Sequence, residues 1–501
     1  MGTVRVGDSL QQRVRWGVAC ATLPLALAVT LACSNSSAPP ASTAAVDPAP
    51  ESHGDGMLGQ VSKADQDSGR SQKPYVKNMR LVGQQDVRNR GANGNLSYLG
   101  ECAYVAAYYG GTDALAGLAI VDATNPQNPE LFKLLPGAPG TRSPQTEVNQ
   151  ARKILGVMPY SLENGPYGDP PGPTQLLMYD VSKDCKNPEL LGVYDFGKVT
   201  THEFGFSPDG MTAYATVNRN ADPSQPPVPG DALMVVDVSD PKNPKTLTTW
   251  DLSQEPGMPK SGMHDLDFND EGTRAYTSSR WFQDGVQHKG MTILDVSEVT
   301  ARRPNPKIRR ISSFNWGPPQ QGLSHTTVGP LTINGRPFVI SLDEGTGSNG
   351  TEPRGWGRLI DISNERYPLQ VSTIQLPVSL MENAEKTKAD RADYATHFVS
   401  VDDRHNAHLA FISWYSSGLR VWDIRNPYDP QEIGYYIPGA RINTTLKLPE
   451  RGRNNKYVDY VYSYPRYRPE TGHIWTTSIF NGLLILELID NPLRQASART
   501  H

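Results

Sequence analysis

Residues 233–241 read Leu233-Met-Val-Val-Asp-Val-Ser-Asp-Pro241, an apolar run followed by an acid, a turn and a proline. Similar runs recur roughly every 50 to 65 residues, a period typical of small sheets arranged around an axis. The other copies lie at 118–126, 176–188, 291–306, 358–361, 419–427 and 482–487. A run that is apolar throughout fits a strand packed on both faces, as in stacked blades. The repeat therefore predicts an all-β protein, a seven-bladed β-propeller.

The ends of the chain predict how the ring closes. The expected blades cover residues 93–140, 146–198, 200–252, 262–314, 323–377, 395–440 and 457–490. The last blade lacks an outer strand, but Met79-Arg-Leu-Val-Gly83 matches the outer strand Glu189-Leu-Leu-Gly-Val193 of another blade. We therefore predict that residues 76–84 complete the last blade, which removes two exposed sheet edges.

The repeated phrase resembles that of the bacterial and archaeal LVIVD-repeat proteins. The copies most similar to it are 233–241 and Leu118-Ala-Ile-Val-Asp-Ala-Thr-Asn-Pro126. The resemblance extends over nearly all of the chain after residue 76 and implies an extracytoplasmic β-propeller. It implies little about activity, because propellers host binding modules and enzymes alike.

Composition is that of a large globular β-protein. Apolar residues make up 37% and charged residues 20% of the chain, and the 45 glycines and 42 prolines suit short strands joined by many turns. The net charge is −4 and no basic run occurs, which argues against a nucleic-acid partner. We expect one monomeric propeller domain, since propellers grow by adding blades around one axis.

The N-terminus indicates export. Arginines precede an apolar stretch at 18–32 that is short for a membrane span, and Cys33 follows it. This pattern resembles a bacterial lipoprotein signal, in which Cys33 is acylated; secretion with cleavage nearby is the alternative. We predict a signal peptide over 1–32, a flexible Pro/Ala/Ser-rich tether over 33–72, the propeller over 73–492 and a tail over 493–501. The protein would then be lipid-anchored to a membrane of the bacterial cell envelope.

Cys102 and Cys185 are the two cysteines left when Cys20 and Cys33 are assigned to the signal. An oxidising compartment permits a disulfide between them. Their spacing does not show whether the Cα atoms come close enough for one, so the pairing stays open.

Four histidines open successive blades, at intervals of 62, 61 and 72 residues: His202, His264, His325 and His397. Because the first strand of each propeller blade lines the axis, equivalent positions converge there. Four imidazoles on an axis could hold iron, copper, zinc or manganese. The arrangement is similar in geometry to the four-histidine iron site of carotenoid-cleaving oxygenases and to the selenium-binding/methanethiol oxidase group, without an extended sequence match to either.

Carboxylates follow two of these histidines. Glu203 and Asp265 are candidates for orienting metal-bound imidazoles, a common role of neighbouring acids. Neighbours on a strand point to opposite faces, so neither acid can orient its own histidine without a bulge. Two other roles stay open for the histidines: packing against a turn of the next blade, or binding an organic ligand on the axis.

Two further clusters have ordinary and functional interpretations. The segment Asp343-Glu-Gly-Thr-Gly347, with Asn349 and Glu352, is either an acidic turn or a calcium loop, although its spacing differs from that of an EF-hand. Alternating tyrosines between Tyr457 and Tyr467 either pack between blades or line a carbohydrate or peptide groove.

Two functions of different classes follow. The first, which we favour from sequence, is an envelope-anchored binding module for an extracellular ligand or envelope protein. The second is a metal-dependent oxidoreductase with the four histidines as ligands. Whether the protein is an enzyme is not decided by its sequence.

Overall fold

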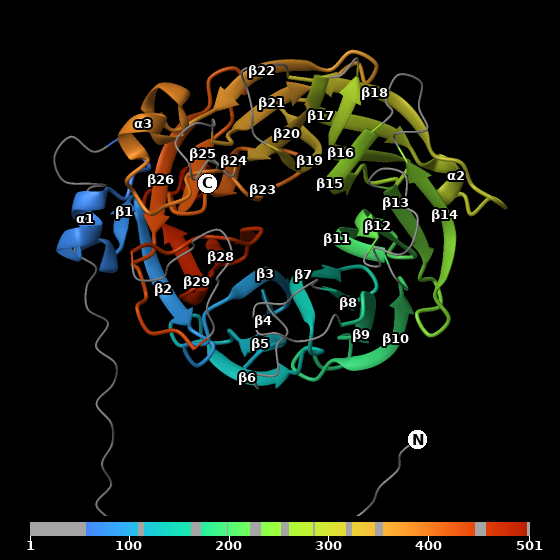
Figure 1. Cartoon of the computed structure of the whole chain (residues 1–501), viewed down its shortest axis with the longest axis horizontal. Coiled ribbons are helices and arrows are strands. Elements are labelled where there is room, and N and C mark those ends of the chain that lie inside the picture. Colours follow the sequence, from blue (N-terminus) through green and yellow to red (C-terminus); the bar gives the residue numbers. More distant parts are fainter. Residues whose placement is uncertain are drawn as a thin grey trace, which may run out of the picture. The chain divides into compact units, whose positions relative to one another are not determined.

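The computed structural model of the protein describes residues 57–108, 115–161, 172–197, 199–220, 232–251, 260–283, 286–316, 323–345, 354–445 and 457–497. The predicted signal peptide, Cys33 and most of the predicted tether lie outside these residues. Seven antiparallel blades surround a central axis, as predicted (Figure 1). The first strand of each blade lies near the axis and the last strand at the rim.

The first three blades follow in chain order. Blade one contains β3 (Asn93–Leu99), β4 (Cys102–Ala107), β5 (Leu118–Asp122) and β6 (Glu130–Leu135). Blade two contains β7 (Thr141–Asn149), β8 (Ile154–Ser161), β9 (Gln175–Asp180) and β10 (Glu189–Asp195). Blade three contains β11 (Val199–Phe206), β12 (Thr212–Asn220), β13 (Ala232–Asp237) and β14 (Lys245–Asp251).

The next three blades repeat this order. Blade four contains β15 (Lys260–Phe268), β16 (Arg274–Gln283), β17 (Val286–Asp295) and β18 (Arg309–Asn315). Blade five contains β19 (Leu323–Ile333), β20 (Arg336–Glu344), β21 (Gly357–Asp361) and β22 (Leu369–Ile374). Blade six contains β23 (Val399–Val401), β24 (Leu409–Ser413), β25 (Leu419–Asp423) and β26 (Gln431–Ile437).

The N-terminal part of the chain completes the last two blades. Blade seven is formed by β27 (Arg466–Arg468), β28 (His473–Ser478), β29 (Gly482–Leu488) and, at its rim, β2 (Met79–Gln85). The predicted closing strand is thus confirmed. A second strand, β1 (Tyr75–Lys77), adds to the rim of blade six by pairing with β26. Consecutive N-terminal strands therefore join two adjacent blades.

The repeated phrase forms the third strand of each blade and the turn after it. The strand β25 is buried along its apolar run and β21 throughout, because neighbouring blades cover both faces. The acid that ends the run caps its own turn: Asp237 Oδ1 accepts a hydrogen bond from the Ser239 N–H at 3.0 Å. The same bond is made by Asp122, Asp180, Asp295, Asp361 and Asp423.

Glycines let outer strands approach the turn of the next blade. A Cβ atom on Gly192 would lie 1.9 Å from the carbonyl oxygen of Pro241, and one on Gly83 would lie 2.0 Å from that of Pro126. Each glycine follows a register shift in its strand pairing. The turn of one blade therefore packs directly on the rim strand of the blade before it.

Blades one and two are linked more closely than the others. Ala107 of β4 pairs with Ser143 of β7, which joins the two blades into one eight-stranded sheet. At the other end of β4, Cys102 forms a disulfide with Cys185, with a Cα–Cα distance of 5.9 Å. The disulfide that the sequence left open thus spans these two blades.

Residues 57–72, which we predicted as part of the tether, pack on the propeller instead. They include α1 (Lys63–Ser68) and the 3-10 helix η1 (Arg70–Gln72). The Val61 N–H donates to Tyr394 Oη at 3.1 Å, and Gln60 Nε2 donates to Asp390 at 2.6 Å. The tether prediction is wrong for these residues because Val61 and Gln60 have buried partners in the connection between blades five and six.

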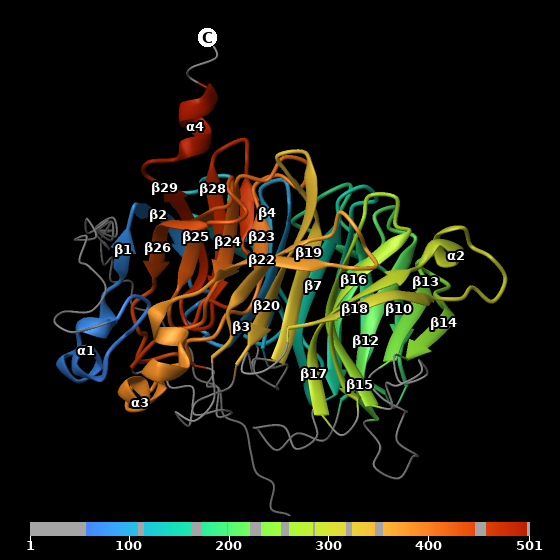
Figure 2. The same cartoon turned by 90° about the horizontal axis from the view of Figure 1, so that it is seen from above.

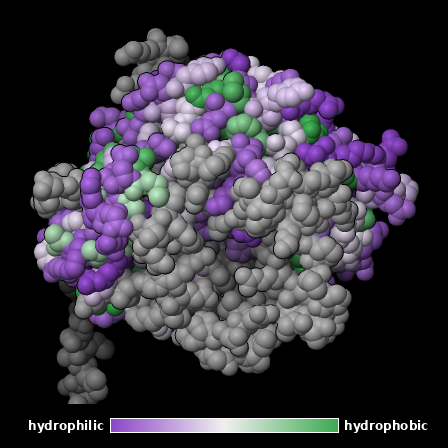
Figure 3. Space-filling model, turned by 45° about the horizontal axis from the view of Figure 1, so that its top comes forward, coloured by the Kyte–Doolittle hydropathy of each residue, from purple (hydrophilic) through white to green (hydrophobic). Residues whose placement is uncertain are grey.

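Short helices lie on the faces of the ring. They are α2 (Ser297–Thr300), η3 (Pro377–Ser379), η4 (Met381–Asn383), α3 (Ala384–Thr387) and α4 (Pro492–Ser497). α3 and α4 lie toward opposite faces (Figure 2). Among the described residues, no helix has the length and apolarity needed to cross a membrane. The described surface visible in Figure 3 is mostly hydrophilic, with scattered apolar residues.

Candidate functional site

Three of the four histidines lie at irregular positions of inner strands, and His397 lies two residues before β23. In β11, Thr201 pairs with Val217 and Phe204 with Ala215, so that His202 and Glu203 together face one residue of β12. The pairing of β15 shifts in the same way around His264 and Asp265, and that of β19 shifts around His325. Such bulges re-aim side chains, and they occur often beside active sites. On a regular strand, a histidine and the acid that follows it point to opposite faces. At a bulge the two side chains can point to the same side, so they can act together.

The four imidazoles form a continuous arc on the axis. The ring centroids lie 4.5 Å apart for His202 and His264, 3.8 Å for His264 and His325, and 4.3 Å for His325 and His397. His325 and His397 are buried, whereas His202 and His264 are half-buried. The predicted convergence of four blades is therefore present in the structure.

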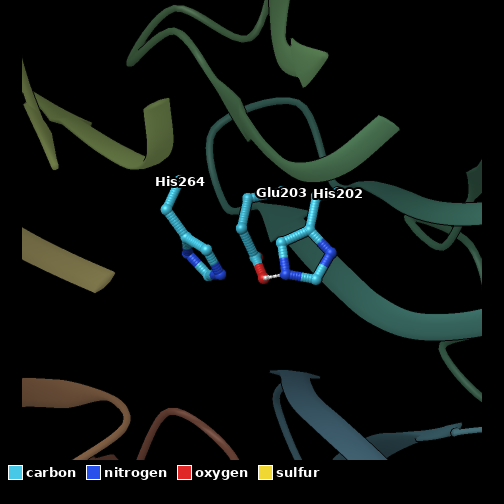
Figure 4. Close-up of side chains that lie close together, drawn as sticks. All are labelled: His202, Glu203 and His264. Atoms are coloured by element: carbon cyan, nitrogen blue, oxygen red, sulfur yellow. Dashed lines mark ion pairs between the residues drawn. The ribbon is translucent and has the colours of Figure 1, made fainter. Parts of the chain in front are cut away.

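Two carboxylates join this arc. The donor atoms of His202, Glu203 and His264 all lie within 4.8 Å of one another, and so do those of His264, His325 and Glu344. Glu203 Oε1 is 4.0 Å from His202 Nε2, and Glu344 Oε2 is 3.9 Å from His325 Nε2 (Figure 4 shows the first group). Each group offers two imidazoles and one carboxylate, and His264 belongs to both. His397 belongs to neither group.

Residues of neighbouring blades position these groups. Gln145 Nε2 donates a hydrogen bond to Glu203, and Tyr415 Oη donates to Glu344 at 2.6 Å. His397 Nδ1 lies 2.6 Å from the carbonyl oxygen of Tyr462, which fixes its ring and leaves Nε2 as its second nitrogen. Partners of this kind orient ligands in metal sites.

Asp265 has a different role from the one we predicted. It accepts hydrogen bonds from the Tyr464 hydroxyl and from the Leu266 N–H, and among the described residues it bonds to none of the four histidines. Burial raises the pKa of Asp265 to about 7. The bulge turns its carboxylate toward blade seven, so Asp265 does not orient a histidine.

Burial determines the charge of the central histidines. Desolvation lowers the pKa of His264 and of His325 well below the usual range, and the next histidine in the arc lowers it further. Both imidazoles are therefore neutral at pH 7, which is the form that binds metals. In addition, Nδ1 of His264 is buried and has no hydrogen-bond partner among the described residues.

The other three blades carry different residues at the equivalent positions. Blade one has Gly94 and blade two has Ser143 within the corresponding bulge, while blade seven has Tyr462 next to His397. The histidines thus occupy one contiguous side of the axis, contributed by blades three to six.

The remaining predicted clusters have structural roles in the described residues. Asp343 forms a buried ion pair with Arg358, whose Nη2 lies 2.8 Å from Asp343 Oδ2, and burial raises the pKa of Asp343. The rest of the predicted calcium segment, 346–352, lies outside the described residues. Tyr460 and Tyr462 are buried in an apolar cluster between blades six and seven, as packing residues are.

Three positioning or ligating residues were not found from sequence. Glu344 was read as part of a possible calcium turn, and Gln145 and Tyr415 carry no motif. The signal that could have pointed to Glu344 is its place at the end of the strand that pairs with the histidine-bearing strand β19.

Comparison with known families agrees with the repeat. A model of the LVIVD repeat matches residues 229–251, which include the third strand of blade three. The chain therefore contains an LVIVD repeat. No curated protein matches the chain significantly.

Several solved structures are similar to this LVIVD-repeat protein at low identity. The β-propeller domain of Myceliophteria thermophila Cps50 (Swd1) has 11% identity and a TM-score of 0.48, covering 82% of this chain and 99% of that one. The Pseudomonas aeruginosa periplasmic gluconolactonase PpgL has 11% identity and a TM-score of 0.45, covering 80% and 89%. Chaetomium thermophilum Sqt1, bound to the N-terminus of ribosomal protein L10, has 10% identity and a TM-score of 0.45, covering 81% and 99%.

Proposed function

We propose that this LVIVD-repeat protein holds a transition-metal ion on its propeller axis and acts as a metal-dependent oxidoreductase. The observation that carries the proposal is the pair of donor groups that share His264, one with His202 and Glu203 and one with His325 and Glu344. Two histidines and one carboxylate are a donor set that suits non-haem iron and leaves coordination positions open for substrate.

The surroundings of the histidines support a metal site over simple packing. A buried imidazole nitrogen without a partner costs free energy unless something binds it, and His264 Nδ1 is such an atom. The hydrogen bonds from Gln145 and Tyr415 hold the two carboxylates in place without neutralising them. Packing alone would require neither the orphan nitrogen nor the paired acids.

Elemental analysis of the purified chain, produced without a histidine tag, tests the proposal. We expect about one equivalent of a transition metal in the native protein and less than a tenth of that in His264→Ala. His405→Ala is the matched control, because the His405 side chain is 73% exposed and lies away from the arc. Unfolding temperatures of all three proteins show whether each is folded.

Two results would overturn the metal proposal. One is a native protein that holds no metal even after incubation with iron, copper, zinc and manganese. The other is a folded His264→Ala variant that retains as much metal as the native chain. If metal is bound, loss of oxygen consumption in His264→Ala during a substrate screen would identify the reaction as an oxidation.

We also propose that the protein is exported and anchored through a lipid on Cys33. The disulfide between Cys102 and Cys185 supports export, because disulfides persist in oxidising compartments. We expect the native chain to enter the detergent phase on membrane fractionation and Cys33→Ser to leave it. Equal partitioning of both forms would contradict the anchor and favour simple secretion.

A second candidate function is the binding module that we favoured from sequence. The observation that favours it is a cavity on the axis, further along the strands that carry the histidines.

A further inference from the structure

A cavity of about 340 Å³ lies on the axis beyond the histidine arc. Its walls include Phe204, Leu266 and Val328, which follow the histidines on the same inner strands, Val399, which begins β23 after His397, and Val148 of blade two. Side chains of this kind enclose the apolar body of a small molecule.

Most acids of this cavity are already satisfied by the protein. Asp267 Oδ1 lies 3.0 Å from Arg404 Nη1, and its Oδ2 accepts the Gly329 N–H at 3.0 Å. Asp265 accepts bonds from Tyr464 and Leu266 with its two oxygens. These carboxylates therefore offer little to a cationic ligand.

Arg466 is the charged group that remains open to the cavity. Its Nε donates to the Leu96 carbonyl oxygen at 3.0 Å, and its guanidinium carbon lies 5.1 Å from the centre of the Tyr464 ring. Its two terminal Nη atoms donate no hydrogen bond within the described part of the chain. In Arg404, by contrast, both terminal nitrogens are used, Nη1 by Asp267 and Nη2 by the Phe268 carbonyl oxygen at 2.7 Å, and only its buried Nε has no partner among the described residues.

Glu147 completes the polar lining of the cavity. Burial raises the pKa of Glu147 to about 8, so its carboxyl group is mostly protonated at pH 7. A protonated carboxyl repels an anion little and can itself donate a hydrogen bond. A guanidinium with two open N–H groups matches a carboxylate in a bidentate pair.

We propose that the axial cavity binds a small organic carboxylate with an apolar or aromatic body, whose carboxylate pairs with Arg466. A dianion such as a phosphate monoester suits the site less, because one open guanidinium would have to balance it beside three acids. The inference concerns the cavity and holds whether or not the histidines bind a metal.

Isothermal titration of the full chain with benzoate and 2-naphthoate tests this inference. We expect saturable binding that strengthens from benzoate to naphthoate as more apolar surface is buried. The neutral benzamide should bind at least tenfold more weakly than benzoate, and benzylamine should not bind. A preference for benzylamine or equal binding of benzamide and benzoate would overturn the proposal, as would no binding of either acid.

Variants locate the binding. Arg466→Gln should weaken naphthoate binding at least tenfold, whereas Arg80→Gln should leave it unchanged, because the Arg80 side chain is 68% exposed at the rim. If Arg466→Gln fails to fold, Val401→Trp provides the second test, since a large side chain at this lining position fills the cavity. Undiminished binding by a folded Arg466→Gln or Val401→Trp would contradict the assignment. Metal content, measured on the same samples, reports separately on the histidine site.

Discussion

The rim and the axis of this propeller are built from the same repeat. At the rim, equivalent positions of the blades carry nearly the same residues, whereas at the axis these residues differ from blade to blade. At the rim, six blades close their third strand with an aspartate that caps the following turn. At the axis, bulges carry histidine in blades three to five, His397 precedes the first strand of blade six, and the other blades have other residues there. The aspartate recurs in six of the seven blades because its role in capping the turn is the same in each of them. The histidines, in contrast, are confined to four contiguous blades, as expected for the axial metal site that we propose.

The largest expected effect comes from blade five, where the ion pair of Arg358 and Asp343 supports the fold and His325 is a proposed metal ligand. Arg358→Met leaves Asp343 buried without its partner, and we expect it to lower the free energy of unfolding by about 3–5 kcal/mol. His325→Ala, two strands away, should cost less and should chiefly remove metal. Urea unfolding of both variants checks this order, and the reverse order would mean that the axis is a packing layer.

Removing the disulfide should weaken the blades that lack histidines. Cys102 and Cys185 are 83 residues apart, and losing a link across a loop of that size typically costs about 2–4 kcal/mol. Urea unfolding of the Cys102→Ser, Cys185→Ser double variant measures the loss. Metal content should stay unchanged, and a parallel loss of metal would show that the two sides of the ring are coupled.

A rim glycine gives the next smaller effect. In Gly192→Ala the added Cβ would collide with the Pro241 carbonyl oxygen, and we expect a loss of about 1–3 kcal/mol in unfolding free energy. Gly197→Ala is the control for the added methyl group, because nothing lies within 4 Å of its Cβ position, although its positive φ adds strain. Equal stability of Gly192→Ala and the native protein would contradict the close packing of turn on rim.

The smallest effect concerns pH at the rim. Burial alone would raise the pKa of Asp122, but hydrogen bonds from Lys186 and Thr124 outweigh it and lower the pKa to about 2. A depressed pKa stabilises the fold above the unfolded-state value near 3.9, and this contribution is lost as pH falls toward 2. Because the pair is partly exposed, we expect about 1 kcal/mol or less. Unfolding measured from pH 5 to pH 2 should show a shallower decline in Asp122→Asn, and an identical decline would refute the pair.

The sequence predicted the ring, its closing strand and the arc of histidines because each depends on a repeat or on a match between distant segments. The direction in which the side chains around the histidines point depends instead on strand register, that is, on which residues of adjacent strands pair. The bulges at His202, His264 and His325 arise from pairing with the next strand, which no local pattern reveals. For the same reason Glu203 was expected to point away from its histidine.

Other parts of the site could not be predicted because they come from different blades. Gln145 and Glu203 meet across the boundary of blades two and three, and Tyr415 reaches Glu344 from blade six to blade five. The segment 57–72 was assigned to the tether by its polar composition, yet Tyr394, in the connection between blades five and six, binds Val61. Contacts between elements far apart in the chain decided each case.

The strands β1 and β2 determine when the ring can close during synthesis of the chain. They are made first, but their partners β26 and β29 are made last, so the ring can close after synthesis of nearly the whole chain. Until their partners are made, β1 and β2 are unpaired, and unpaired strand edges invite pairing with other chains. We therefore expect a truncated chain that lacks β29 to remain an open arc and to aggregate.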